Sequence, residues 1–98
     1  MVKRFMVYEV NVNDEIKPCV VVSPDELNNV LPYVMVAPVT SKIRPLPYRI
    51  LIEMKGRDAQ IALDQIRTRP KSDFLRKLGR LPEPCQVEIM RVLHQFFE

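Results

Sequence analysis

Glycine and tryptophan are scarce in this chain, and their scarcity removes several familiar classes of site. Only Gly56 and Gly79 occur among the 98 residues, so the sequence contains neither a glycine-rich phosphate loop nor a Gly-x-Ser-x-Gly nucleophile motif. There is no tryptophan, and the single histidine is His94. Because no carboxylate or nucleophile is placed to work with His94, we expect it to be a boundary residue of a helix rather than a catalytic base.

Cysteine and long apolar runs are also rare. Cys19 and Cys85 are far apart and form no Cys-x-x-Cys pair, so the zinc and iron–sulfur spacings are missing and we expect no metal and no cofactor. No stretch approaches the roughly 18 apolar residues that a membrane-spanning helix needs, and the N-terminus does not resemble a secretion signal. We therefore expect a cytoplasmic protein that has no membrane partner and keeps both thiols reduced and mostly buried.

Charged and hydrophobic residues are present in ordinary proportions. Hydrophobic residues make up 47% and charged residues 28% of the chain, which favours one folded domain over residues 1–98 rather than disorder. The net charge is only +3, but basic residues concentrate between Lys42 and Arg57 and again between Arg67 and Arg80. Two interpretations stay open: an anionic partner, or solvated side chains on the rim of a small protein.

Apolar alternation and β-branched runs predict five strands. The first strand has one clearly apolar face, and the second is a continuous β-branched run that begins after Pro18. Asn13-Asp14-Glu15 is predicted to be the tight turn between them. The predicted strands are residues 4–12, 19–22, 33–39, 48–54 and 60–68.

Capping residues predict two short helical segments. Ser23 is expected to cap a helix that begins at Pro24, and Glu26 is placed to complete a capping box. A helical turn is expected over residues 72–78, and Gly79 is expected to end it.

A longer amphipathic helix is predicted from residue 82 to the end of the chain. Its apolar side is formed by Ile89, Met90, Val92, Leu93, Phe96 and Phe97, and the sheet or a partner must cover that side. Short strands, tight connections and few helices predict a mainly β (α+β) fold. We expect a small, strongly curved antiparallel sheet or half-open barrel with helices on its periphery.

Three segments of the chain resemble one known family. Residues 18–28 form a strand followed by Ser-Pro and an Asn, residues 36–42 read Val-Ala-Pro-Val-Thr-Ser-Lys, and residues 63–68 read Leu-Asp-Gln-Ile-Arg-Thr. The segments have the order and spacing found in the MazF/PemK toxin family, and the third is the most specific. The chain resembles this family over essentially its whole length.

The resemblance implies an SH3-like barrel with a C-terminal helix and a homodimer. A dimer of this kind is expected to bury on the order of 1,200 Å² or more. The resemblance also implies a sequence-selective, metal-independent endoribonuclease toxin that cleaves single-stranded mRNA and is neutralised by a cognate antitoxin. In such an enzyme a ribose 2′-OH attacks the adjacent phosphate, which leaves a cyclic phosphate and a free 5′-OH.

The same resemblance assigns site residues. Lys17 and Thr40 match the cation and the hydroxyl that stabilise charge on the phosphate, and Asp64 matches a carboxylate that acts as a base. Basic side chains around them are expected to hold phosphates, and Tyr48 is expected to stack on a base. The expected RNA-binding residues are Ser41, Lys42, Arg44, Tyr48, Gln65, Arg67, Arg69 and Lys71.

Two departures from the family pattern keep a second hypothesis open. The first loop is several residues shorter, and Lys17 stands where the family has an Arg. Lys keeps the charge but lacks the planar fork that grips a phosphate with two hydrogen bonds. The alternative is therefore a catalytically degenerate, toxin-like dimer that binds antitoxin or RNA without cutting.

Other interpretations also stay open for the function of a protein with this fold and for the roles of single residues. A gyrase poison of the CcdB type shares the fold, but it relies on a C-terminal Trp that this chain lacks. A structural role competes with the functional one for each residue: flanking a turn for Lys17, ending a strand for Thr40, and holding a dimer or a loop for Gln65 and Arg67.

Overall fold

The computed structural model describes residues 2–96, so the predicted place of Phe97 in the terminal helix lies outside the described residues. In chain order the elements are β1 Met6–Val12, β2 Glu15–Val21, α1 Asp25–Asn28, β3 Tyr33–Thr40, β4 Arg49–Met54, β5 Arg57–Ala62, the 3-10 turn η1 Leu63–Gln65, β6 Arg67–Pro70, the 3-10 turn η2 Lys71–Asp73, β7 Phe74–Arg80 and α2 Glu83–Phe96.

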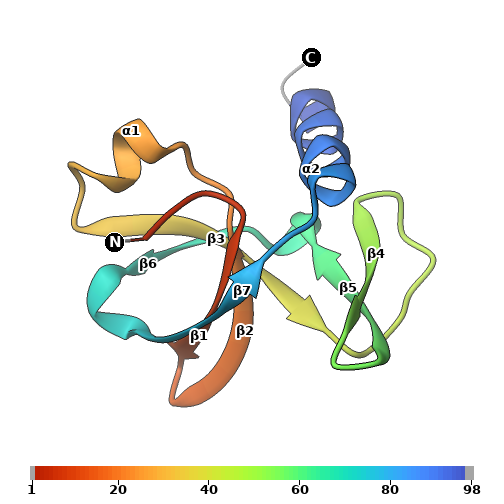
Figure 1. Cartoon of the computed structure of the whole chain (residues 1–98), viewed down its shortest axis with the longest axis horizontal. Coiled ribbons are helices and arrows are strands. Elements are labelled where there is room, and N and C mark those ends of the chain that lie inside the picture. Colours follow the sequence, from red (N-terminus) through yellow and green to blue (C-terminus); the bar gives the residue numbers. More distant parts are fainter. Residues whose placement is uncertain (1, 97–98) are drawn as a thin grey trace.

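The described strands form one strongly curved antiparallel sheet. Their order is β4-β5-β3-β2-β1-β7, and β6 pairs with β3 beside this path. Figure 1 shows the β4–β5 hairpin standing apart from β1, β2 and β7, with β3 crossing between the two groups and α2 at their upper side. The predicted mainly β class, a half-open barrel with peripheral helices, is confirmed.

The hairpin of β1 and β2 is tighter than the sequence predicted. Val12 pairs directly with Glu15, so only Asn13 and Asp14 form the turn. Both have positive φ, 53° and 67°, which is the backbone of the two-residue turns that match strand twist. Strand β2 therefore begins at Glu15, and Pro18 lies inside it opposite Glu9.

Strand β3 organises the sheet because it changes partners along its length. Its residues Val36–Pro38 pair with β2, while on the other edge Tyr33–Val36 pair with β6 and Val39–Thr40 pair with β5. The prediction of one continuous strand over 60–68 was wrong, because η1 interrupts it where the pairing passes from β5 to β6. The interruption carries Leu63 into the core, where it is 1% exposed.

The predicted helical turn over 72–78 was also wrong. Apart from the short turn η2, this segment is strand β7, which pairs with β1. Long-range packing overrides the local helical signal here: the Phe74 ring packs edge-on against Tyr8 with 5.3 Å between centroids, and Leu78 packs against the main core.

The helix α1 begins at Asp25, one residue later than predicted, and the predicted capping by Ser23 is absent. Pro24 takes the N-cap position without a side-chain cap. The Ser23 hydroxyl is instead buried, donates to Asn28 Oδ1 and accepts from the Met35 amide. Asn28 Nδ2 donates to the Ser23 carbonyl at 2.8 Å. This buried network ties α1 to β3.

The terminal helix α2 covers one side of the main core. Ile89 and Val92 are buried, and Leu93 and Phe96 pack against the same cluster, so the predicted apolar side is confirmed for these residues. Met90 differs, since it stays 40% exposed. Within residues 2–96 no helix is long and apolar enough to cross a bilayer.

The buried network of Asn28 predicts a measurable loss of stability. Asn28→Ala leaves the Ser23 hydroxyl and carbonyl with unmade hydrogen bonds, so the free energy of unfolding should fall by about 1–3 kcal/mol. Urea denaturation followed by circular dichroism measures the change. Asn29→Ala, at the exposed neighbouring position, is the matched control and should change the free energy by less than about 0.5 kcal/mol.

Candidate functional site

A cavity of about 270 Å³ opens where β2, the end of β3 and the η1–β6 segment meet. We call it the Lys17–Thr40 cavity. Five of the residues that the sequence predicted for the site line it together: Lys17, Thr40, Ser41, Gln65 and Arg67. The expected RNA-binding residues Lys42, Arg44, Tyr48, Arg69 and Lys71 do not line it, and neither does Asp64.

Strand register explains why distant residues meet in this cavity. Cys19 pairs with Pro38 in an antiparallel ladder, so continuing the register by two residues places Lys17 across from Thr40. Side chains two apart on a strand share a face, which puts Lys17 and Cys19 on the same side. Arg67 pairs with Val36 on the opposite edge of β3, and η1 holds Gln65 at the rim.

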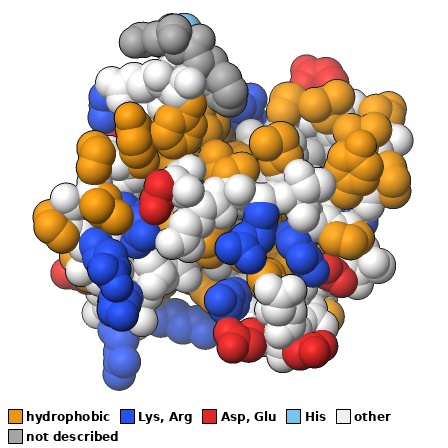
Figure 2. All heavy atoms as spheres, turned by 180° about the vertical axis from the view of Figure 1, so that it is seen from behind, with side chains coloured by type: hydrophobic (Ala, Val, Ile, Leu, Met, Phe, Trp, Pro, Cys, Tyr) orange, Lys and Arg blue, Asp and Glu red, His pale blue; other side chains and the backbone are white. Residues whose placement is uncertain are grey.

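The charges around the cavity are mostly positive. Arg67 makes no ion pair within residues 2–96, and Lys17 makes only a long contact of 3.5 Å with Glu15. Because both partners of that contact are well exposed, the pair contributes little to stability. Figure 2 shows Lys and Arg side chains gathered over the lower half of the face that lies behind the view of Figure 1. This face is suited to an anionic ligand.

The pKa of the Cys19 thiol is affected by the same positive charges, but the thiol is not a reactive group. Burial raises its pKa to about 11, although the positive charges of Arg67, Lys17 and Arg69 act in the opposite direction. The thiol is therefore protonated at neutral pH and is neither a nucleophile nor a base there. Cys19 and Cys85 are both free, one buried and the other half-buried, as predicted.

Thr40 and Ser41, the first residue of the loop that follows it, also line the cavity. Thr40 Oγ1 accepts a hydrogen bond of 3.1 Å from the Lys42 amide, so its own proton can be donated to an oxyanion. The loop is anchored by Gln60, which accepts from the Arg44 amide at 3.0 Å and donates to the Arg44 carbonyl at 2.9 Å. Lys42 and Arg44 are both exposed beside the cavity.

Asp64 lies outside the cavity lining and is committed to another contact. The Arg49 guanidinium donates to both carboxylate oxygens of Asp64, at 2.7 and 3.2 Å, and the Arg49 side chain is only 5% exposed. This bidentate hydrogen bond holds the pKa of Asp64 below its ordinary value of 3.8. The pair ties β4 to η1, and such a carboxylate is a weak base.

Three other predicted residues have structural contacts in the described region. The Tyr48 ring packs against Phe96 of α2 with 4.7 Å between centroids. Arg69 pairs with Asp73 and donates to the Asn11 carbonyl at 3.3 Å. Lys71 lies in η2. No group of three His, Cys, Asp or Glu side chains within residues 2–96 is arranged as metal ligands would be.

Glu15 lies outside the lining of the cavity but contacts Lys17, a contact that the sequence analysis missed. It was assigned to the turn, but it is the first residue of β2 and pairs with Lys17. The signal that identifies it is the Asn13-Asp14 pair, since both residue types tolerate positive φ. A two-residue turn there places Glu15 two positions before Lys17 on the same strand face.

The curved sheet and the cavity define a class of protein: a small half-open β-barrel that gathers cations and hydroxyls where an anionic chain can lie. The family model for the PemK-like, MazF-like toxin of type II toxin-antitoxin systems matches residues 3–97. The chain belongs to this family.

Solved structures show the same fold. A mycobacterial endoribonuclease in complex with its cognate antitoxin matches with a TM-score of 0.88 and 21% identity, covering 97% of this chain and 93% of that chain. The Mycobacterium tuberculosis toxin MazF-mt6 matches with a TM-score of 0.83 and 19% identity, covering 94% and 95%. A chain of the MazE–MazF complex from Deinococcus radiodurans gives 0.83 and 19%, covering 97% and 93%. No curated protein sequence matches the chain.

The Arg49–Asp64 pair predicts a pH-dependent stability difference. Asp64→Asn removes the ion pair and leaves a nearly buried guanidinium unpaired, so the variant should unfold more easily at neutral pH. Because the folded-state pKa of Asp64 lies below 3.8, the wild-type advantage should persist above that value and shrink as the pH falls through the folded-state pKa. Urea unfolding of both proteins across the acid range measures it.

The control for this experiment is Asp58→Asn, which removes an exposed carboxylate that forms no ion pair within residues 2–96. Its difference from wild type should stay small at every pH. A wild-type advantage over Asp64→Asn that grows toward low pH would contradict the structural role of the pair.

Proposed function

We propose that this protein is a metal-independent endoribonuclease toxin that cleaves single-stranded mRNA in the cytoplasm and is neutralised by a cognate antitoxin. The observation that carries the proposal is the Lys17–Thr40 cavity, which gathers Lys17, Thr40 and Arg67 from three strands. Membership of the toxin family supports it, as does the fold shared with a mycobacterial endoribonuclease.

The reaction needs charge stabilisation more than it needs a covalent intermediate. The ribose 2′-OH attacks the adjacent phosphorus while the bond to the 5′ oxygen breaks, which gives a 2′,3′-cyclic phosphate and a 5′-OH. Negative charge develops on the non-bridging oxygens. In the proposed complex Arg67 and Lys17 neutralise that charge and the Thr40 hydroxyl donates a hydrogen bond to it. Such preorganised donors contribute strongly to catalysis.

Glu15 and Lys17 are suited to the two proton transfers. The Glu15 carboxylate accepts the proton of the 2′-OH, and the Lys17 ammonium donates a proton to the departing 5′ oxygen. The two groups lie 3.5 Å apart, longer than an ordinary hydrogen bond, so in the proposed cycle exchange with solvent restores the carboxylate of Glu15 and the ammonium of Lys17 after each turnover. A Lys can act as this acid, whereas an Arg stays protonated in proteins, so the replacement of the family's Arg favours proton donation over a bidentate grip.

The remaining cations extend the site along the RNA. Ser41 and Gln65 line the cavity, where they can bond the sugar or a base edge. Lys42 and Arg44 continue on one side, and Arg69 and Lys71 follow on the other side along β6 and η2. In our proposal these side chains hold the phosphates of an unpaired strand, and Asp64 positions η1 through Arg49 instead of serving as the base.

Cleavage of a long unstructured RNA in EDTA tests the proposal. Wild-type protein should produce discrete cuts with 5′-OH ends. Thr40→Val and Lys17→Gln should each lower the cleavage rate by about a hundredfold or more, because each removes a group that stabilises the transition state. Arg91→Gln, which removes an exposed cation on α2, is the charge-matched control and should cut at the wild-type rate.

The same experiment separates the enzyme from its degenerate alternative. The two-residue β1–β2 turn leaves the cavity without the longer loop of the family, which is the observation that favours a protein that binds RNA but does not cut it. Retained RNA binding with no cuts would support that alternative and would sink the nuclease. Asp64→Asn cutting at the wild-type rate would confirm that Asp64 is not the base.

We also propose a homodimer that covers the apolar groove between β3 and α2. This groove, of about 340 Å³, is lined by Met35, Met90 and Leu93, among others. Met35 and Met90 are 41% and 40% exposed, so the apolar side of α2 is only partly covered by its own chain. A second copy of the chain supplies the missing cover.

Charge at the centre of this groove should prevent dimerisation. Met90→Lys places an ammonium in the proposed interface, where it is desolvated without a partner, so the apparent mass at micromolar concentration should fall from two chains to one. Analytical ultracentrifugation measures it. Leu51→Lys adds the same charge at an exposed apolar residue of β4 and should remain dimeric. A wild-type protein that sediments as one chain would contradict the dimer.

A further inference from the structure

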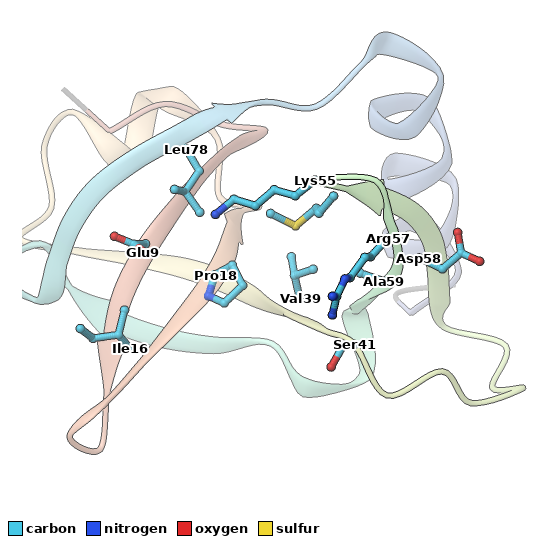
Figure 3. Close-up of a pocket in the computed structure, with 11 residues that line it drawn as sticks. Glu9, Ile16, Pro18, Val39, Ser41, Lys55, Arg57, Asp58, Ala59 and Leu78 are labelled. Atoms are coloured by element: carbon cyan, nitrogen blue, oxygen red, sulfur yellow. The ribbon is translucent and has the colours of Figure 1, made fainter.

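A second and larger cavity adjoins the Lys17–Thr40 cavity. It has a volume of about 490 Å³ and lies between the β1–β2 hairpin, the β4–β5 hairpin and β7. Figure 3 shows Pro18 and Val39 near its middle, Leu78 above Pro18 and Ile16 at the lower left of the lining. We call it the Ile16–Leu78 cavity. Its volume and apolar floor are suited to a planar ring system.

Strand alternation makes the two cavities neighbours. Along β2, Lys17 and Cys19 line the first cavity, whereas Ile16 and Pro18 line the second. Val39, near the end of β3, and Ser41, just after β3, line both cavities. The two cavities therefore share a lip of extended backbone, and a polymer that crosses this lip places consecutive units in the two cavities.

Ile16 is an apolar residue of this cavity whose exposure the packing of the fold does not explain. Its side chain is 63% exposed on a strand that ends in a tight turn, and it belongs to neither hydrophobic cluster of the described chain. It nevertheless faces the cavity together with Leu78, which packs against the core. A ring seated between them would remove Ile16 from water.

The rim of the cavity is positively charged. Lys55 and Arg57 make no ion pair within residues 2–96, and Figure 3 shows Lys55 extending across the cavity toward Leu78 and Arg57 pointing toward Ser41. Of the two acids in the lining, Asp58 points away from the cavity and Glu9 is paired with Arg76 at 3.1 Å. The apolar floor thus has cations beside it, which fits a base attached to phosphates.

From this geometry we infer that the Ile16–Leu78 cavity holds the nucleobase next to the scissile phosphate. The assignment rests on the proposed nuclease function and names a subsite of the same substrate. Arg57 points toward Ser41 of the shared lip and binds the phosphate that joins the nucleotides in the two cavities. Ile16, Pro18 and Leu78 contact the faces of the base, which makes one flanking position of the RNA necessary for efficient cleavage.

A base-deletion experiment tests the subsite. The substrate is a short DNA strand with one ribonucleotide at a mapped cleavage position, and an abasic spacer replaces the base on each side in turn. At one of the two positions the abasic spacer should lower kcat/KM by about tenfold or more. Ile16→Ser should cause a similar loss on the intact substrate and no further loss on that abasic substrate, because both changes remove the same contact.

The matched control is Leu51→Ser, which truncates an apolar side chain of almost equal exposure, 60% against 63% for Ile16, outside both cavities. It should leave kcat/KM unchanged on every substrate. Arg57→Gln should weaken the dependence of affinity on salt by about one phosphate contact. Equal losses for Ile16→Ser on intact and abasic substrates, or no loss, would overturn the assignment and leave the cavity to another ligand, such as a protein side chain.

A binding measurement keeps this test separate from the proposed nuclease activity. The same strand, made entirely of DNA and carrying 2-aminopurine at the sensitive position, reports burial of the base by its fluorescence. If nothing is cut, a short DNA strand of mixed sequence carries 2-aminopurine at each position in turn. A change on binding to wild type that Ile16→Ser abolishes and Leu51→Ser preserves supports the subsite even if the protein does not cut RNA. An identical change in all three proteins overturns it.

Discussion

The main-chain pairing of β3 is the constraint on which the rest of the structure depends. One edge of β3 bonds to β2, and the other bonds first to β6 and then to β5. Because buried backbone groups must find partners, the change from β6 to β5 fixes where η1 interrupts the chain and where the sheet curls. The Lys17–Thr40 cavity is lined by residues of β3, of the η1–β6 segment beside this change and of β2 on the other edge of β3, so backbone hydrogen bonds to β3 hold much of its shape.

Six of the basic side chains fall into two groups that differ in whether they form ion pairs. Arg49, Arg69 and Arg76 are paired with Asp64, Asp73 and Glu9, and each pair joins two segments or closes a turn. Arg67, Lys55 and Arg57 make no ion pair within residues 2–96 and lie beside a cavity. The ion pairs of the first group stabilise the fold. The second group has no acidic partner within that range, so its positive charge is available to an anionic ligand. A count of basic residues in the sequence does not separate them.

Sequence patterns were most reliable where a residue's role is local. Alternation located β1, β3 and β4, and helical spacing located α2, because the side chains involved face one continuous core. The segments around Thr40 and Gln65 were linked only by resemblance to a family, and strand register then accounts for their meeting. The sequence failed at 72–78 and at Ser23, where pairing with β1 and a buried bond to Asn28 override local preferences. Glu15 was missed because its role depends on the length of a turn.

The two-residue turn between β1 and β2 has a kinetic consequence. A tight hairpin whose strands pair up to the turn has no flexible loop that must move aside before a ligand enters. If RNA is the ligand, as proposed, its encounter with the protein should be limited by diffusion and by the attraction between its phosphates and the basic face, so that association slows steeply as ionic strength rises. In the proposed nuclease no closing loop would add selectivity by induced fit, so discrimination between sequences would rest on the contacts made by the bound RNA.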